Sequence, residues 1–240
     1  MLETEKGSLF IVATPIGNLG DITFRAVKTL GEVDIIAAED TRRSRILLNH
    51  YNLRTTLSSY NSYNKERKGK EFIRMLNQGK DVALISDAGT PGISDPLFHL
   101  VQSAIQEEIT IHPIPGPSAL LAALNVSGLP MDRFLFEGFL PRKKGRRGRL
   151  EELALSERTV VIYESPHRID KTLNDLLKYF GNRSAVIARE LTKIHEEAAR
   201  GSLEELIDLS QGRKWKGEAT LVIAGKSKRR SKDLEKANAR

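Results

Sequence analysis

Three loops rich in glycine, proline and small polar residues are the strongest chemical feature of this sequence. They span residues 13–21, 86–96 and 113–119, and each follows an apolar run of the strand type. Because the carboxyl ends of parallel strands meet at one edge of a sheet, we expect the loops to form a single ligand site. None contains a lysine, so they suit backbone contact with an uncharged or zwitterionic ligand better than a triphosphate.

Two further segments carry groups that can bind or transfer protons. Residues 190–196 contain two carboxylates together with Lys193 and His195, and a second pair of carboxylates stands at Glu39 and Asp40. Such mixtures are typical of general acid and base chemistry. A solvated charged loop is the alternative interpretation of either segment.

Composition excludes several other chemistries. The chain has no cysteine, which rules out a disulfide, a thiolate nucleophile and a cysteine-bound metal. Its five histidines show no HxxxH spacing, so we expect no metal site. No GxGxxG or GxSxG motif is present, and the P-loop-like ending at 224–227 lacks the earlier glycine that position 220 would have to supply.

The sequence gives no sign of membrane association. No apolar run approaches the ~18 residues of a membrane span, and the first six residues are too polar for a signal peptide. We therefore expect a cytoplasmic protein.

The net charge of +7 is unevenly distributed along the chain. Residues 140–150 carry six bases and no acid, and residues 226–240 carry seven bases against two acids. These two runs exceed the total, so the rest of the chain is net acidic. Two basic segments on an acidic body favour a polyanionic partner, nucleic acid first. A solvated linker and a basic tail without a partner are the alternative.

Strand and helix patterns alternate, which predicts two α/β domains. Apolar runs predict strands at 9–13, 34–38, 82–85, 109–113, 134–138, 159–163, 184–189 and 219–224. Amphipathic patterns predict helices at 23–30, 42–50, 65–77, 97–106, 118–125, 149–154, 166–179 and 203–209. We expect a mostly parallel sheet in the first domain and a mixed sheet in the second. The predicted organisation is an N-terminal domain 1–139, a basic linker 140–148, a C-terminal domain 149–226 and a basic disordered tail 227–240.

The loops and three charged stretches together resemble the tetrapyrrole-methylase-like methyltransferases. The segments that carry the resemblance are 14–23, 87–96, 115–119, 38–42, 163–168 and 188–196. Within the family they are most similar to the bacterial members that 2′-O-methylate a cytidine in the decoding region of 16S rRNA. The resemblance covers about Leu9 to Gly225. It implies a cofactor cleft between the two α/β domains, S-adenosylmethionine as cofactor, 16S rRNA or the small ribosomal subunit as substrate, and a homodimer.

The resemblance also implies which residues hold the cofactor. They are Pro15, Asp87, Ala88, Gly89, Thr90, Ser94, Ser118 and Ala119, and, on the adenine side, Tyr163, Ala188 and Thr220. The residue types themselves support part of this assignment. Gly89 permits close backbone approach, and the Asp87 carboxylate suits a sulfonium cation. A turn-forming role is the alternative for Asp87.

An RNA substrate requires side chains that bind phosphate and hydroxyl groups. Glu164 is a candidate for substrate contact. The basic candidates are Arg42, Arg43, Arg142, Lys143, Lys144, Arg146, Arg147, His167 and Arg168.

Methyl transfer to a ribose needs the 2′-oxygen in line with the methyl group about 3 Å away, and its proton must leave. We expect the pKa of Lys193 to be lowered by burial near Arg189, so that this residue serves as the base or orients the oxygen. Glu190 would be its partner. Glu39 and Asp40 are the alternative bases.

Two other functions remain open at this point. A tetrapyrrole methyltransferase would keep the fold and cofactor, but those relatives tend to carry a longer glycine-rich first loop and a Gly-Asp-Pro loop. This chain has Ser-Asp-Ala-Gly-Thr-Pro at 86–91 instead. A non-catalytic RNA-binding module would keep the basic segments without binding the cofactor.

Overall fold

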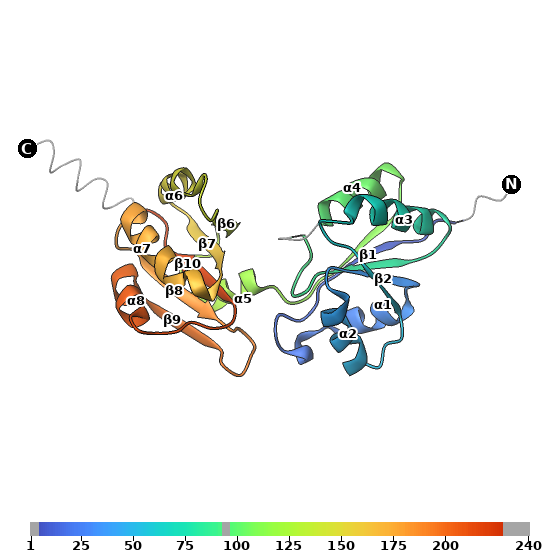
Figure 1. The fold of residues 1–240 in the computed structure, drawn as a ribbon, viewed down its shortest axis with the longest axis horizontal. Helices are drawn as coiled ribbons and strands as arrows, with labels where there is room; N and C mark the ends of the chain where they lie inside the picture. The colour runs from blue at the N-terminus through green and yellow to red at the C-terminus, as the bar shows by residue number, and fades with distance from the viewer. Residues whose placement is uncertain (1–4, 93–96, 228–240) are drawn as a thin grey trace, which may run out of the picture. The chain divides into compact units, whose positions relative to one another are not determined.

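The computed structural model describes residues 5–92 and 97–227, and the chain forms two compact units, Met1–Ser118 and Ala119–Arg240 (Figure 1). Ser94 lies outside the described residues, as does the basic tail from residue 228 onwards. Within the described ranges, no helix is both long and apolar enough to cross a membrane.

The first unit is built on a parallel sheet of five strands in the order β3-β2-β4-β1-β5. All residues of β2 and β4 are buried, as expected for the centre of a parallel sheet covered on both faces. The strands are β1 (Leu9–Val12), β2 (Ile35–Ala38), β3 (Thr56–Ser59), β4 (Val82–Ile85) and β5 (Ile111–Ile114).

Helices cover both faces of this sheet (Figure 1). On one face, Leu30 and Leu47 pack against Ile36 in one core cluster. On the other face, Phe72 and Leu100 belong to a second cluster. The first pair of helices is α1 (Phe24–Glu32) and α2 (Thr41–His50), and the second pair is α3 (Lys65–Asn77) and α4 (Leu97–Gln106).

The second unit contains a mixed sheet of five strands in the order β6-β7-β10-β8-β9. Strands β6 and β7 pair in parallel, and every other pair is antiparallel. The two α/β units and their sheet types are therefore as the sequence predicted. The strands are β6 (Phe134–Phe139), β7 (Thr159–Glu164), β8 (Ser184–Arg189), β9 (Glu197–Ser202) and β10 (Ala219–Ile223).

One face of this second sheet forms the core of the unit. Ile162, Ile187 and Leu221 pack there with Leu173 and Leu206 from two of the helices. The helices of the unit are α5 (Ala119–Ser127), α6 (Arg146–Ala154), α7 (Ile169–Phe180) and α8 (Leu203–Ser210), and a short 3₁₀ turn, η2 (Pro166–Arg168), precedes α7.

The division of the chain differs from the one expected from sequence. Strand β6 pairs with β7 in the second sheet, so it belongs to the second unit rather than to a first domain ending at residue 139. The expected linker 140–148 connects β6 to α6 inside that unit, and α6 begins at Arg146. An apolar strand followed by a run of basic residues has the same local pattern whichever sheet the strand joins.

Candidate functional site

The loops that follow β1 and β4 leave the first sheet in opposite directions. The chain passes from β1 into α1 on one face, and from β4 into α4 on the other. Neighbouring parallel strands whose connections diverge in this way create a crevice at their carboxyl ends, where open α/β sheets bind ligands. The carboxyl ends of β1 and β4 are therefore the candidate site of this unit, and this place is called the β1/β4 edge below.

Two of the glycine- and proline-rich loops are bonded to each other at this edge. The backbone N–H groups of Thr14 and Gly89 each donate to the other residue's carbonyl at 3.0 Å. The Thr14 hydroxyl also donates to the Ser86 carbonyl at 3.3 Å, and the Ser86 hydroxyl donates to the Gly89 carbonyl at 3.2 Å. These bonds fix the start of the second loop against the end of β1.

The third loop closes on the first two. The Thr90 hydroxyl donates to the Pro117 carbonyl at 3.1 Å. Gly116 lies so close to Ala13 that a Cβ on the glycine would stand 3.1 Å from the Ala13 Cβ. Residues far apart in sequence thus meet at one edge of the sheet, with backbone groups close together as a small-ligand site requires.

Gly89 occupies a position that only glycine fills easily. Its φ is +79°, in the left-handed region, and a Cβ there would lie 3.1 Å from Ile16 Cγ2 and 3.5 Å from the Pro117 carbonyl oxygen. Both the backbone conformation and the surrounding atoms therefore oppose a side chain at this position.

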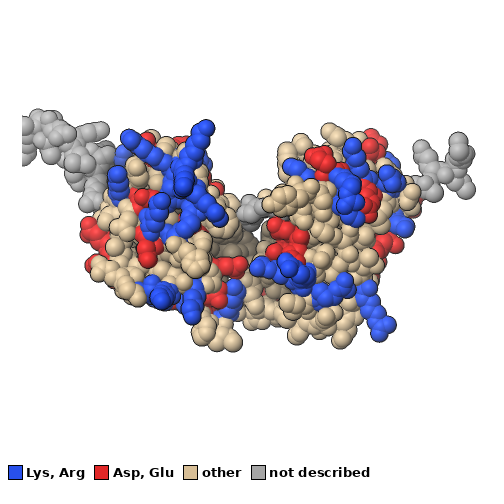
Figure 2. Space-filling model, viewed as in Figure 1, with Lys and Arg blue, Asp and Glu red and all other residues tan. Residues whose placement is uncertain are grey.

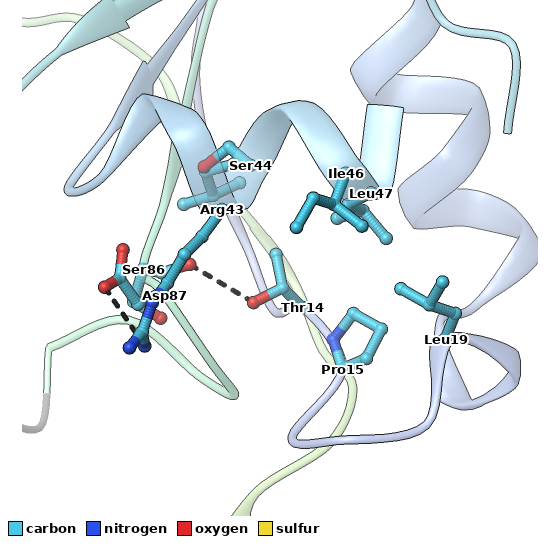
Figure 3. A pocket seen from close by; sticks show the side chains of 10 residues that line it. Thr14, Pro15, Leu19, Arg43, Ser44, Ile46, Leu47, Ser86 and Asp87 are labelled. Atoms are coloured by element: carbon cyan, nitrogen blue, oxygen red, sulfur yellow. Dashed lines mark hydrogen bonds and ion pairs between the residues drawn. The ribbon is translucent and has the colours of Figure 1, made fainter. Parts of the chain in front are cut away.

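A pocket opens beside the Thr14–Gly89 bridge. Figure 3 shows Thr14 pointing toward Ser86, and Arg43 reaching from α2 to Asp87. Of the expected cofactor residues, Pro15 and Asp87 line this pocket, whereas Ala88, Gly89 and Thr90 belong to the same loop without lining it. The lining residues are Thr14, Pro15, Leu19, Arg43, Ser44, Ile46, Leu47, Ile85, Ser86 and Asp87.

The contribution of α2 to the pocket was not foreseen from sequence, apart from Arg43. Ser44, Ile46 and Leu47 come from the first two turns of this helix. One signal could have indicated them. Asp40 is a helix N-cap directly after β2, and β2 lies next to β4, so the helix must start at the same edge of the sheet.

Asp87 joins the end of β4 to the start of α2. Its Oδ1 accepts a hydrogen bond from the Asp40 backbone N–H at 2.9 Å, and its Oδ2 lies 3.5 Å from the Arg43 guanidinium. The Asp40 carboxylate is bonded to the side chain and backbone N–H of Arg42, which hold the pKa of Asp40 well below its usual range. Such a weakly basic carboxylate is poorly suited to accept a proton, so Asp40 is disfavoured as an alternative base.

The three cofactor candidates of the second unit form one row across its sheet. Thr220 on β10 is paired directly with Tyr163 on β7 and with Ala188 on β8. Paired residues share a face, so all three lie opposite the Ile162, Leu221 and Ile187 row of the core. This second face is where α5 packs against β8 and β10. Ala119, another candidate, is the first residue of α5, and Ser118 precedes it.

Tyr163 is partly enclosed on this face. Its ring contacts Phe136 at a centroid distance of 4.9 Å and Phe139 at 5.7 Å. Burial raises the pKa of the Tyr163 hydroxyl, so this group is a neutral hydrogen-bonding group at physiological pH.

Lys193 is held by two carboxylates. Its Nζ donates to Glu190 Oε1 at 2.8 Å and to Glu218 Oε2 at 3.1 Å. Burial disfavours the charged ammonium, but these hydrogen bonds outweigh burial and raise the pKa of Lys193 above its ordinary value. The sequence predicted a lowered pKa, and that prediction was wrong, because the bonds to Glu190 and to Glu218, which comes from a distant part of the chain, together outweigh burial. A lysine that stays protonated cannot serve as a base.

The segment around Lys193 is conformationally unusual. Glu190 and Thr192 both have positive φ, 49° and 68°. Glu190 is also packed so tightly over Gly217 that a Cβ on the glycine would stand 2.1 Å from the Glu190 Cδ. Backbone strain of this kind concentrates at functional sites. His195 lies exposed in the same loop.

The basic segment after β6 contains exposed residues and one buried residue that is bonded within the protein. Arg142, Lys143, Lys144 and Arg147 are exposed, and Figure 2 shows basic side chains gathered over the α6 region. Arg146, by contrast, is buried, with its guanidinium bonded to Asp175 at 2.8 Å, to the Thr172 hydroxyl at 2.8 Å and to the Pro141 carbonyl. Arg146 thus has a structural role, and the prediction that it contacts RNA phosphate was wrong.

Glu164 is likewise part of the interior. It is 2% exposed, accepts a hydrogen bond from the Thr172 hydroxyl at 2.6 Å and pairs with Arg168 at 3.3 Å. The prediction that Glu164 contacts the substrate was therefore wrong. Arg168 also donates to the Leu140 carbonyl, which fixes the start of the basic segment, while His167 is exposed in η2.

We expect Arg146→Ser to destabilise the second unit by roughly 3 kcal/mol. The substitution leaves Asp175 and Thr172 without their buried cationic partner. Urea denaturation measures the loss, and Lys144→Ser, an exposed neighbour, is the control that we expect to stay within about 0.5 kcal/mol of the parent. Equal stability of both variants would show that Arg146 is not a structural anchor.

The fold and site together define a class of protein: an α/β protein with a small-ligand site at the carboxyl edge of a parallel sheet, joined to a mixed sheet. The chain belongs to the family of tetrapyrrole (corrin/porphyrin) methylases, whose family model matches residues 8–207.

Individual relatives are more specific. The chain is 53% identical over 222 residues to ribosomal RNA small subunit methyltransferase I of Halalkalibacterium halodurans, covering 92% of this chain and 77% of that protein. It is 50% identical to the protein of the same name from Thermotoga maritima, covering 92% and 99%. Uroporphyrin-III C-methyltransferase from Thermus thermophilus, complexed with S-adenyl homocysteine, has the same fold, with a TM-score of 0.63, 17% identity and coverage of 91% and 97%.

Proposed function

We propose that this chain is an S-adenosylmethionine-dependent methyltransferase that 2′-O-methylates a cytidine in the decoding region of 16S rRNA. The observation that carries the proposal is the identity of 50% and more, over most of the chain, to proteins named ribosomal RNA small subunit methyltransferase I. The cofactor is supported independently by the geometry of the first unit, where three glycine- and proline-rich loops meet at the β1/β4 edge.

The residues at this edge fit a zwitterionic cofactor. A Cβ on Gly89 or on Gly116 would stand 3.1 Å from Ile16 or Ala13 of the first loop, so glycine at both positions lets the loops approach one another closely. The nearby Asp87 carboxylate complements a sulfonium. We propose that the cofactor is bound by Pro15, Asp87, Ala88, Gly89, Thr90, Ser118 and Ala119, and by Ser94, which lies outside the described residues. Its adenine is bound by Tyr163, Ala188 and Thr220.

When bound, the cofactor supplies an electrophilic methyl group on a sulfonium. The chain must hold the ribose 2′-oxygen in line with that group and stabilise the oxygen as its proton leaves. Lys193 is suited to orienting the oxygen, because its raised pKa keeps it a cation. Glu190 holds the ammonium in place. The proton leaves to water or to Glu39, the remaining alternative base.

The substrate is held through its phosphates. The exposed bases Arg142, Lys143 and Lys144 and the exposed His167 are available for this role. Four further bases are also paired with carboxylates of the protein, namely Arg42, Arg43, Arg147 and Arg168. Assembly as a homodimer in the cytoplasm is part of the proposal, and sedimentation of the purified protein tests the dimer.

We expect replacement of the four exposed bases of the segment after β6 to weaken rRNA binding. The variant carries Ser at positions 142, 143, 144 and 147 and leaves buried Arg146 in place. Each lost phosphate contact flattens the plot of log K against log salt, by up to about three units of slope in total for a single strand. Cofactor affinity should stay at the parent's value. If rRNA affinity and the slope of its salt dependence stay unchanged, these four residues do not contact the RNA.

A tetrapyrrole substrate is the second candidate, favoured by the family to which the chain belongs. Calorimetric titration with S-adenosylmethionine, followed by transfer of a labelled methyl group to either rRNA or a tetrapyrrole, separates the candidates. Methyl transfer to rRNA supports the proposal. Transfer to the tetrapyrrole alone would replace it. Absence of cofactor binding, with no thermal shift, would leave a non-catalytic RNA-binding module.

A further inference from the structure

The loop between β3 and α3 presents an aromatic side chain fully to solvent. Tyr63 is 100% exposed, whereas Tyr60, three residues earlier, is 1% exposed and packs edge-on against Phe72. The chain therefore buries one tyrosine of this segment in the core and leaves the other with its ring uncovered. A ring exposed in this way can stack on the bases of an unpaired nucleic acid.

The loop that carries Tyr63 is held in place by its own asparagines. The Tyr63 backbone N–H donates to Asn61 Oδ1 at 3.1 Å, and the Asn61 N–H donates to Asn64 Oδ1 at 2.9 Å. The Asn64 amide in turn donates to the Ser59 carbonyl at 3.2 Å, which ties the loop to the end of β3. Tyr63 is thus presented on a bonded turn, which limits the entropy lost when a partner binds.

The position of this loop relates it to the candidate site. β3 pairs in parallel with β2, and the Tyr60 N–H extends that ladder to the Ala38 carbonyl at 2.8 Å. β2 is followed by Asp40 and α2, which supplies Arg43 to the pocket. β3 and β4 are two strand spacings apart, roughly 10 Å. Tyr63 therefore lies at the same edge of the sheet as the cofactor loops.

A stripe of three basic residues runs along α3, the helix that begins two residues after Tyr63. Arg67, Lys70 and Arg74 have the i, i+3, i+7 spacing of one helix face, and all three are exposed. None forms an ion pair with any residue that the structure describes, whereas Lys68 on the neighbouring face pairs with Glu71. The stripe extends about 10 Å along the helix axis.

An exposed aromatic ring followed by unpaired cations is the arrangement that binds unpaired nucleic acid, through base stacking and phosphate contact. We propose that Tyr63 stacks on an unpaired base of the RNA substrate while Arg67, Lys70 and Arg74 follow its phosphates along α3. This surface rests on the proposed function for its substrate class. It adds a recognition element in the first unit to the basic segment of the second.

A fluorescent variant tests the stacking directly. The chain has a single tryptophan, Trp215, which is buried, so Tyr63→Trp introduces an exposed reporter. We expect a short unpaired oligoribonucleotide of mixed sequence to quench the new emission. The same oligonucleotide with its bases removed keeps the phosphates and should quench far less. Binding of the intact oligonucleotide without a change in emission would overturn the proposal.

Kinetics on rRNA provide the second test. We expect Tyr63→Ala to raise the KM for rRNA about tenfold, with the Kd for S-adenosylmethionine and the rate at saturating rRNA unchanged. Tyr63→Phe should restore the KM, because it keeps the ring, whereas Tyr63→Leu should not. If Tyr63 had only a structural role, Tyr63→Ala would lower the stability of the protein and would change both the KM for rRNA and the Kd for S-adenosylmethionine.

The charge stripe has a matched control in the same unit. We expect serine at Arg67, Lys70 and Arg74 to weaken rRNA binding and flatten its salt dependence. The control replaces Arg25, Lys28 and Arg54, three exposed bases on the layer of α1 and α2, and should have little effect. If both triple variants lose the same rRNA affinity, the stripe acts only through the net charge of the protein and is not a specific binding surface.

The outcomes separate this inference from the function on which it rests. If the parent protein methylates no RNA, the proposed function fails. If the parent methylates rRNA and Tyr63→Ala behaves identically, the proposed function survives and the stacking surface fails. If Tyr63→Ala matters only for assembled subunits, and RNA leaves the tryptophan emission unchanged, Tyr63 contacts a ribosomal protein and stacking is rejected.

Discussion

Gly89→Val should abolish measurable S-adenosylmethionine binding, a loss of at least about 100-fold in affinity. Valine is β-branched, and at a φ of +79° it is forced out of the backbone conformation that the loop adopts. Its Cβ would also crowd Ile16 of the first loop, whose Cγ2 would stand only 3.1 Å away. The Thr14–Gly89 bridge, and with it the arrangement of all three loops, should be lost. Isothermal calorimetry measures the effect.

Gly212→Val is the matched control for this experiment. Gly212 also has a left-handed φ, +71°, but a Cβ there meets no atom within 4 Å. It therefore reproduces the backbone strain without the crowding, and we expect its cofactor affinity to match the parent's. Circular dichroism checks that both variants fold. If folded Gly89→Val binds the cofactor as the parent does, the β1/β4 edge is not the cofactor site.

Lys193→Ala should lower the single-turnover rate of methyl transfer by about 100-fold, with a change of less than about threefold in cofactor Kd. That magnitude is typical of removing one preorganised donor from a developing oxyanion. Glu218→Gln is the control, because it removes only the more exposed carboxylate of the cluster, and we expect a small effect.

The pH dependence separates the two roles considered for Lys193. Its pKa is raised above the ordinary 10.5, so the ammonium is present throughout the neutral range and is lost only as the pH rises through that raised value. We therefore expect no ionisation of Lys193 in the rate profile between about pH 6 and 9. A rate that climbs with pH in that window, and loses its climb in Lys193→Ala, would instead identify Lys193 as a base.

The sequence predicted most elements because their signals are local. Apolar runs and helix caps placed β4, α3, α4 and β8 at their observed bounds. The missed strands are β3 and β9, each of which lies at one edge of its sheet. Their residues, Thr56–Ser59 and Glu197–Ser202, include only one large apolar side chain, Leu57. No apolar run marked them.

Prediction of the site failed where burial depends on distant partners. Arg146 stands in a run of basic residues that looks solvated, and only Asp175 and Thr172 on α7 make it an interior residue. Lys193 similarly depends on Glu218, 25 residues later. The meeting of the three glycine- and proline-rich loops was predictable, because their composition is a local signal and the carboxyl ends of parallel strands lie at the same end of a sheet.

The most direct test of the proposed function is to locate the methyl group. Unmodified 16S rRNA and small ribosomal subunits are incubated with the protein and S-adenosylmethionine, and mass spectrometry of the digested RNA maps every new methyl group. We expect one new 2′-O-methylcytidine in the decoding region with the parent protein, and none with Gly89→Val. A methyl group on a base, or no RNA methylation by a preparation that methylates a tetrapyrrole, would contradict the account.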